Sequence, residues 1–332
     1  MAHSSIQRVA IVGAGLSGLV CARQLQAAGL GVCLFDKSRG LGGRMATRRV
    51  DGVGEFDHGA QYFTVSDPSF QSAVTGWLEA GVCAEWQAKI AVARHGDWRG
   101  TSDASRRFVG TPTMTAIAKW LAEPLVVERN ARIVGLERHD IGWSLNAEDG
   151  RRWNDFDAVL LTAPAPQTRA LLPPSSALTS QVAEISIAPC WSALLAFEQP
   201  LPLEFDGAFV EDSALSWICR QNGRPGRSEQ FERWVLHTSP AWSQDHVDLP
   251  AEDARVAMLN AFWEATGVTA VEPSYQQVHR WLYSLPTNTL RERALFDEGL
   301  GLGVAGDWCG GPKIEGAYLS GLALSRLVTA SA

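Results

Sequence analysis

Three glycines near the start of the chain have the G-x-G-x-x-G spacing of a phosphate-binding turn: Gly13, Gly15 and Gly18. The apolar run Val9–Val12 precedes them, and Asp36 follows 18 residues after the last of them. Glycines at this spacing allow a tight turn, a close approach of backbone to a pyrophosphate and close packing of the next helix. The Ser17 hydroxyl can donate to phosphates, and the Asp36 carboxylate can accept hydrogen bonds from an adenosine ribose. The pattern predicts a dinucleotide-binding turn; an ordinary glycine turn is the alternative.

A second glycine-rich loop follows this acid directly. Residues 37–47 contain a Gly-Gly-Arg motif that ends at Arg44. Glycines let backbone N–H groups come close to a bound cofactor, and an arginine can reach a phosphate or a ring. The loop resembles the second signature of the amine-oxidase-like flavoprotein superfamily, which stands at this position after the ribose acid. An NAD dehydrogenase has no need of it, so the loop favours FAD; a flexible basic loop is the alternative interpretation.

Two further segments carry the same resemblance. Residues 56–63 read Phe-Asp-His-Gly-Ala-Gln-Tyr-Phe, like the segment that lines the flavin in one branch of the superfamily. Residues 303–307 and 313–321 resemble its C-terminal flavin motif. The resemblance places Asp307 on the ribityl chain and directs the N-terminus of a helix that starts at Ile314 towards the flavin, where a positive helix end suits negative charge. The predicted cofactor-binding residues are Gly13, Gly15, Ser17, Gly18, Asp36, Lys37, Gly43, Arg44, Gly59, Ala60, Gln61, Ala131, Asp307 and Ile314.

A further G-x-G-x-x-G spacing lies near the C-terminus, at Gly301, Gly303 and Gly306. Its glycines precede or lie within a predicted strand, whereas the glycines of a dinucleotide turn follow the strand. We therefore expect no second nucleotide-binding domain. Because the sequence also has no paired-cysteine redox motif, it does not resemble the disulfide-reductase class of flavoproteins.

The chain as a whole resembles the renalase family, particularly its bacterial members. The resemblance rests on residues 36–49, 57–63, 160–172, 234–248, 279–288 and 304–325. It implies an FAD-dependent oxidase that takes hydride from the 2- and 6-dihydro isomers of NAD(P)H. Such an enzyme returns NAD(P)⁺ and passes the electrons to O2, which gives H2O2. The expected partners are therefore a dinucleotide substrate and O2.

A flavin amine or polyamine oxidase is the competing interpretation. Amine oxidases carry a lysine in the substrate-domain half that reaches flavin N5 through water, but this sequence has no lysine between Lys119 and Lys313. Monoamine oxidases attach the flavin to a cysteine upstream of the C-terminal motif, where residues 285–304 contain none. Cys309 follows Asp307 and is at the wrong place, so we expect non-covalent FAD. A flavin-binding redox sensor without catalytic activity is a third possibility.

Hydride transfer from a dihydronicotinamide needs mainly positioning of the donor carbon. No general base is required, so an apolar, aromatic pocket with a few groups for the carboxamide suffices. The candidate catalytic residues are Gln61, Tyr62, His237, Trp281 and Asn288, with Arg220 as a candidate phosphate partner. Simpler interpretations remain open: a core tryptophan for Trp281, a hydrogen-bonded strand histidine for His237 and a solvated loop arginine for Arg220.

These residues need a scaffold, and the N-terminal pattern indicates a β-α-β unit with strands at 9–12 and 32–35. Between the strands, Gly18, Cys21, Leu25 and Ala28 recur at helical spacing, and Gly29 ends the helix. A crossover helix between short strands implies a parallel sheet. The sequence further predicts helices at about 70–80, 113–122, 251–266 and 314–328, and strands near 125–137, 142–147, 156–163, 190–198, 214–220, 232–239 and 302–305.

The 332 residues suit two domains. We expect an α/β fold with a discontinuous Rossmann-type FAD-binding domain, built on a parallel sheet, and an inserted α+β substrate domain. The FAD-binding domain is predicted at 1–64, 104–169 and 294–332, and the substrate domain at 65–103 and 170–293.

Composition excludes several other classes of protein. The net charge of −7, from 29 basic and 36 acidic residues, argues against a nucleic-acid surface. The seven histidines show no metal-ligand spacing, so no metal site is expected. Six scattered cysteines suit reduced core thiols. Residues 1–8 lack the apolar core of a signal peptide, and no run reaches the length of a membrane span, so a cytoplasmic location is expected. The oligomeric state stays open.

Overall fold

The first sheet of the molecule has six strands in the order β19-β20-β13-β1-β2-β9. The computed structural model describes residues 6–101, 103–140 and 142–332. All neighbouring strands pair in parallel except β19, which runs antiparallel to β20 at the edge. The strands are β1 (Arg8–Val12), β2 (Gly31–Asp36), β9 (Val126–Arg129), β13 (Ala158–Leu161), β19 (Ala294–Asp297) and β20 (Leu302–Ala305). The predicted α/β fold class with a parallel Rossmann-type sheet is confirmed. The proposed domain boundaries also cover residues 1–5, 102 and 141, which lie outside the described residues.

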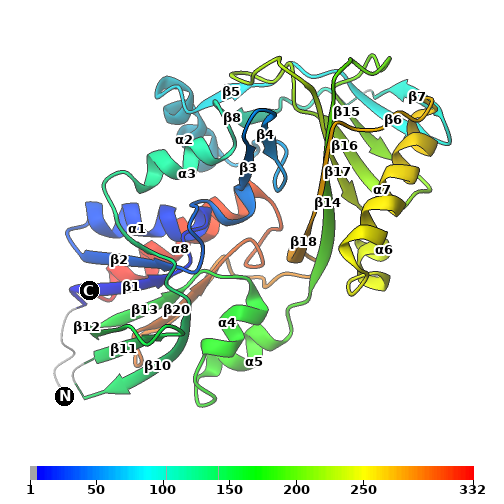
Figure 1. Cartoon of the computed structure of the whole chain (residues 1–332). Helices are drawn as coiled ribbons and strands as arrows, with labels where there is room; N and C mark the ends of the chain where they lie inside the picture. Colours follow the sequence, from blue (N-terminus) through cyan, green and yellow to red (C-terminus); the bar gives the residue numbers. More distant parts are fainter. Residues whose placement is uncertain (1–5, 102, 141) are drawn as a thin grey trace.

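The predicted β-α-β unit is present, with α1 (Leu16–Ala27) between β1 and β2. The Gly13 N–H donates to the Phe35 carbonyl (2.8 Å), which joins the turn to the end of β2. Helix α8 (Ile314–Ala330) packs against α1, and both lie beside the six-stranded sheet (Figure 1). The helices approach so closely that a Cβ at Gly321 would lie 2.2 Å from the Ser17 carbonyl oxygen. The absence of a side chain at Gly321 therefore lets the two helices come this close.

A three-stranded sheet made of β10, β11 and β12 covers the other face of the six-stranded sheet. Its strands are β10 (Ile133–His139), β11 (Gly142–Ala147) and β12 (Arg152–Phe156), and Trp143 and Leu145 pack in one cluster with Val159 and Leu161. The prediction of one strand at 125–137 is wrong. Asn130, with φ of 53°, ends β9, and the chain then leaves the first sheet for the second.

A seven-stranded sheet forms the other half of the molecule, in the order β18-β14-β17-β16-β15-β6-β7. Its strands are β6 (Ile90–Arg94), β7 (Asp97–Gly100), β14 (Ile187–Phe197), β15 (Gly207–Val210), β16 (Leu215–Arg220), β17 (Glu232–Thr238) and β18 (Tyr275–Pro286). The sequence pattern does not reveal β6, β7, β15 or β18. The edge strand β18 is the longest of these, and it shows no buried alternation because Leu282 and Leu285 are exposed and polar residues occupy much of the rest.

Different elements pack on the two faces of this large sheet. Figure 1 shows α6 (Pro240–Asp245) and α7 (Ala251–Thr266) on one side and the hairpin of β3 (Thr47–Val50) and β4 (Gly54–Asp57) on the other. Met258 and Phe262 of α7 pack on Leu195 and Leu236. On the inner side, Phe56 of the hairpin packs on Leu194 and Val235. Residues paired across neighbouring strands share a face. The inner face accordingly carries a row made of His279, Ser192, His237 and Trp217.

The remaining elements connect or cover the two sheets. They are η1 (Gly43–Met45), β3 (Thr47–Val50), β4 (Gly54–Asp57), α2 (Pro68–Glu79), β5 (Cys83–Glu85), β8 (Phe108–Gly110), α3 (Thr115–Ala122), α4 (Ala165–Leu171) and α5 (Ala177–Ala183). Among the described residues, every helix is too short or too polar to cross a membrane.

The close contact between α1 and α8 gives a first prediction. Gly321→Ala forces the helices apart against backbone, and we expect a loss of about 1–3 kcal/mol in the free energy of unfolding. Gly76→Ala in α2 is the matched control, because a Cβ there meets no atom within 4 Å. The control should be neutral or gain up to about 1 kcal/mol from helix propensity. Urea unfolding measures both, and equal stabilities of the two variants would contradict the packing argument.

Candidate active site

At the glycine turn, the start of helix α1 and one buried hydroxyl have no side-chain partner in the described part of the chain. Helix α1 begins after Gly15, and no side chain caps its N-terminus. The Ser17 hydroxyl is buried and has no hydrogen-bond partner among the described residues. A Cβ at Gly15 would meet no atom within 4 Å, although the neighbouring backbone is tightly packed. Free N–H groups, an unpartnered hydroxyl and open space at a helix N-terminus suit a pyrophosphate.

The predicted ribose acid is held rigidly beside this turn. Asp36 accepts hydrogen bonds from the backbone N–H groups of Ala14 (2.8 Å) and Ser38 (2.7 Å). The Ala131 N–H donates to the Asp36 carbonyl (2.8 Å), which places Ala131 at the same strand end. Each carboxylate oxygen keeps a lone pair for a further donor. Lys37 is exposed next to it.

The second loop contacts the glycine turn, and the segment at 56–63 contacts the second loop. The Gly42 N–H donates to the Ala14 carbonyl (3.0 Å), and the Ala60 N–H donates to the Arg44 carbonyl (2.8 Å). A Cβ at Gly59 would lie 2.0 Å from that same Arg44 oxygen, so only glycine fits there. The three motifs, which follow one another in the sequence, therefore form one continuous strip of backbone.

The C-terminal motif joins this strip through an ion pair. The Arg44 guanidinium donates to both carboxylate oxygens of Asp307, at 2.8 and 2.6 Å, and also to the Ser284 carbonyl of β18 (2.9 Å). Arg44 thus links the second loop, the end of β20 and the seven-stranded sheet. Ile314 begins α8, whose N-terminus has no side-chain cap. Gly43, with φ of 55°, lies against the backbone of Gly15.

Two of the candidate catalytic side chains meet at the His58 carbonyl. His237 Nε2 donates to it at 3.0 Å, and Trp281 Nε1 donates at 3.1 Å. The His58 ring stacks on Trp281 and meets the His279 ring edge-on. Burial lowers the pKa of His58 to about 3 and that of His237 to about 4, so both imidazoles are neutral near pH 7. Since a carbonyl only accepts, the proton of His237 is on Nε2.

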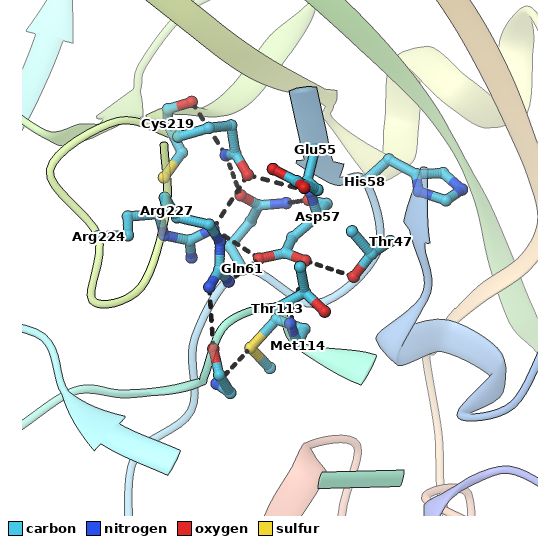
Figure 2. Close-up of polar contacts among 12 residues, drawn as sticks. Thr47, Glu55, Asp57, His58, Gln61, Thr113, Met114, Cys219, Arg224 and Arg227 are labelled. Atoms are coloured by element: carbon cyan, nitrogen blue, oxygen red, sulfur yellow. Dashed lines mark hydrogen bonds and ion pairs between the residues drawn. The ribbon is translucent and has the colours of Figure 1, made fainter. Parts of the chain in front are cut away.

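A buried cluster of charges anchors the start of the same segment (Figure 2). The Asp57 side chain is 0% exposed and pairs with Arg224 and Arg227, which are 0% and 1% exposed. Its other carboxylate oxygen accepts from the Thr47 hydroxyl (2.6 Å) and from the Met114 N–H (3.1 Å). Two guanidinium groups thus share one carboxylate. Burial is the main cause that lowers the pKa of Arg227.

Gln61 and Tyr62 follow in the chain. The polar groups of Gln61 are held by hydrogen bonds within the protein, whereas the contacts of Tyr62 are mainly with aromatic rings. Gln61 donates to the Asp57 and Gly59 carbonyls and accepts from Gln221 Nε2 (3.2 Å), so both of its N–H groups are used. Tyr62 is half-buried among aromatic and cationic groups. Its ring centroid lies 5.4 Å from that of Trp217 and 6.2 Å from that of Trp86, and the Arg107 guanidinium lies 5.3 Å from the ring. Tyr62 is therefore the candidate best placed against an aromatic wall.

The structure gives two other candidates different surroundings. The Asn288 amide accepts from the Ser186 N–H and donates to the Glu184 carbonyl, both at 2.8 Å, so it fastens β18 to the segment after α5. Arg220 lies 3.1 Å from Glu232 and donates to the Leu203 carbonyl, which commits it to the sheet. Neither is hydrogen-bonded to Gln61, Tyr62, His237 or Trp281 within the described part of the chain. The catalytic roles of all these residues stay predictions.

The site has the features of a known flavoprotein family, and comparisons with other proteins agree. A model of a NAD(P)-binding Rossmann-like domain matches residues 11–76. The model described as flavin containing amine oxidoreductase matches residues 80–329, most of the chain. The chain belongs to this amine oxidoreductase family. It is an FAD-dependent oxidoreductase, which confirms the predicted class of enzyme and cofactor.

Individual relatives of this amine oxidoreductase lie at low identity. Renalase from Mus musculus is 24% identical over 305 residues, which cover 87% of this chain and 88% of that protein. Cyclohexylamine oxidase from Brevibacterium oxydans IH-35A superposes with a TM-score of 0.75 at 11% identity, over 98% of this chain and 99% of that one. A putrescine oxidase bound to putrescine superposes with a TM-score of 0.70 at 16% identity and the same coverage. The two solved structures share the fold, and the predicted resemblance to renalase is confirmed.

Several polar residues of the amine oxidoreductase site were not among the predicted residues. They are Asp57, His58, Gln221, Arg224, Arg227 and His279. Asp57 and His58 stand within the motif at 56–63, so the motif itself was a signal. The arginines stand in a Gly- and Pro-containing loop that looks solvated, and only the fold buries them against Asp57.

The open space at Gly15 gives a prediction about the cofactor. Gly15→Ala adds a methyl group where protein atoms are absent, so the free energy of unfolding without FAD should stay within about 0.5 kcal/mol. If the space holds the pyrophosphate, FAD binding should weaken by about 1–3 kcal/mol. Gly100→Ala, which also meets no atom within 4 Å, should change neither quantity. Full FAD affinity in Gly15→Ala would contradict the assignment of the turn.

The charge cluster gives a prediction about stability. Asp57→Asn keeps the shape but leaves Arg224 and Arg227 without a counter-charge in the interior, and we expect a loss of about 3–5 kcal/mol. Asp212→Asn removes the carboxylate of an exposed pair with Arg94 and should cost at most about 1 kcal/mol. Chemical denaturation of both proteins makes the comparison. A loss below about 1 kcal/mol for Asp57→Asn would mean that the cluster is not held by this carboxylate.

Proposed function

We propose that this oxidoreductase oxidises isomeric dihydronicotinamide dinucleotides, the 2- and 6-dihydro forms of NAD(P)H. The products are NAD(P)⁺ and, with O2, H2O2. The observation that carries the proposal is that, within the described residues, the cationic groups beside the Gly59–Tyr62 segment are arginines, which cannot act as a base, and no lysine stands there. Similarity to renalase over most of both chains supports the same class of substrate.

The ionisation of the site argues for a substrate that needs no base. Burial is the first cause that lowers the pKa values of His58, His237 and His279, and it raises that of Tyr62. All four lysines, at 37, 89, 119 and 313, are exposed. A buried lysine of the kind that amine oxidases use is therefore not available. The guanidinium groups nearby stay protonated and cannot accept a proton.

The chemistry of the proposed substrate fits such a site. FAD supplies the hydride acceptor. A dihydronicotinamide ring becomes aromatic when one hydride leaves, so the two electrons and the proton depart together and no separate proton needs a base. Tyr62 and Trp217 would orient the flat ring, and the strip around Gly59 and Ala60 would face the cofactor. The hydride proton and one proton from solvent then accompany the two electrons to O2, which balances H2O2.

We also propose that FAD is held without a covalent bond. The residues that would hold it are the turn at Gly13–Gly18, Asp36, the Gly43–Arg44 loop, Asp307 and the start of α8. Cys309 follows the C-terminal motif, but its thiol is buried within the protein and burial raises its pKa. A protonated, inaccessible thiol does not add to a ring.

Amine oxidation is the second candidate, because the family model and the solved structures of two amine oxidases favour it. The two functions differ in their dependence on pH. An amine must lose its proton before oxidation, so its rate rises steeply with pH, whereas a dihydronicotinamide carries no such proton.

Single-turnover stopped-flow measurements under anaerobic conditions test the proposal. We expect 2- and 6-dihydro-NAD(P) to reduce the flavin at least about 100-fold faster than any amine. The rate should be nearly constant from about pH 6 to 9, because the pKa values of His58 and His237 lie below this range and that of Tyr62 lies above it.

The controls are β-NADH, benzylamine and putrescine, and acid precipitation should first release intact FAD. Reduction by an amine with a steep alkaline rise, and no response to the dihydronicotinamide isomers, would replace this function with amine oxidation. Absence of reduction by every compound would favour the redox sensor.

A further inference from the structure

A closed ring of hydrogen bonds joins the flavin-facing segment to the seven-stranded sheet. The Asp57 N–H donates to Gln221 Oε1 (3.0 Å), and Gln221 Nε2 donates to Gln61 Oε1 (3.2 Å). Gln61 Nε2 donates to the Asp57 carbonyl, which closes the ring, and also to the Gly59 carbonyl (3.1 Å). Figure 2 labels Asp57 and Gln61 of this ring, with Arg224 and Arg227 beside them.

The donor and acceptor roles in this ring leave only one orientation for each amide. The Asp57 N–H and the Arg224 guanidinium, which lies 3.1 Å from Gln221 Oε1, can only donate, so the atom between them is the Gln221 oxygen. Gln221 Nε2 must then face Gln61 and the Cys219 carbonyl. Gln61 is left with its oxygen towards Gln221 and its two N–H groups towards carbonyls.

The same ring is tied to the buried charges. Arg224 Nη1 contacts both Asp57 Oδ2 (3.2 Å) and Gln221 Oε1, and its guanidinium lies 4.8 Å from the Trp86 ring. Gln221 is fully buried and Gln61 nearly so. Rotation of either amide would set two donors or two acceptors against each other in the buried interior, where an unmade hydrogen bond costs the most.

We propose that Gln221 is a positioning residue for the cofactor, which acts through Gln61 to hold Gly59 and Ala60 against the flavin. Gln61 is then a clamp within the protein and not a ligand of the substrate, because its two N–H groups are already committed. Arg224 orients Gln221 and so takes part in the same task. The inference rests on the assignment of Gly59–Gln61 to the cofactor site and not on the identity of the substrate.

The test uses the holoprotein and two variants of similar volume, Gln221→Leu and Gln61→Leu. The rate of FAD release on dilution is followed by flavin fluorescence, and visible circular dichroism reports the surroundings of the bound flavin. Each variant should release FAD about tenfold faster and change the visible dichroism, since both remove the buried hydrogen bond between Gln221 and Gln61. The double variant should be no more than about twofold worse than either single one, because the two residues act as one unit.

Asn222→Leu is the matched control. Asn222 is the next residue and is also buried, but within the described residues its amide bonds with the Ser228 and Phe231 carbonyls of its own loop and with the Arg233 N–H of β17, and not with Asp57 or Gln61. It should lower the melting temperature and leave FAD release and dichroism unchanged. Equal effects of Gln221→Leu and Asn222→Leu on FAD release, or multiplied effects in the double variant, would overturn the proposal.

A second variant guards against a failure to fold. Gln221→Glu keeps an acceptor for the Asp57 N–H and for Arg224, and it removes the N–H groups that face Gln61 and the Cys219 carbonyl. It should fold and still release FAD about tenfold faster; a wild-type release rate would overturn the proposal. None of these readouts uses a dihydronicotinamide, so an error in the proposed substrate would leave their outcome intact.

Discussion

One buried carboxylate, that of Asp57, holds together the parts of the chain that form the site. It receives hydrogen bonds or ion pairs from β3 through Thr47, from the chain before α3 through the Met114 N–H, and from the β16–β17 loop through Arg224 and Arg227. Burial of these charges costs several kcal/mol for each ion, and only mutual pairing offsets it. A pair of this kind does not have to stabilise the fold, but it selects one arrangement of the segments, because any other leaves a charge unpaired. The segment that follows Asp57 therefore starts from a fixed point.

From that point the site is built of backbone more than of side chains. Peptide groups link the glycine turn to the second loop and the second loop to Gly59–Ala60, while Arg44 and Asp307 close the strip onto the C-terminal motif. Glycines stand wherever two backbones touch, since a Cβ at Gly18 or Gly59 would lie 2.0 Å from a carbonyl oxygen. The seven-stranded sheet supports this strip through His237 and Trp281, and the loop after β16 supports it through Gln221. The result is a rigid strip of backbone, in which the loss of one contact changes the position of the neighbouring segment.

Burial of the side chains around this strip also determines which chemistry the site can perform. Imidazoles that are withdrawn from water lose their charge, so the histidines around His58 serve as hydrogen-bonding and stacking groups and not as acids or bases near pH 7. The positive charge of the site belongs to arginines, which cannot give up a proton. A substrate that arrives as a ready hydride donor suits these surroundings, and one that must first be deprotonated does not.

The sequence by itself determined the cofactor and the fold that carries it. The spacing of Gly13, Gly15, Gly18 and Asp36 depends on contacts within one β-α-β unit, and local patterns of this kind are readable because neighbours in the sequence are neighbours in space. Helix α7 and strand β20 were predicted to the residue for the same reason. Only the tertiary structure decided the rest. The hydrogen bond between Gln221 and Gln61 joins residues 160 positions apart, and the burial of Arg224 against Asp57 depends on the closed sheet, so neither contact has a signal in the sequence. The edge strand β18 was missed because an exposed edge carries no periodic signal. Pairings between distant segments leave no local pattern, since their geometry exists only after the two sheets have closed on each other.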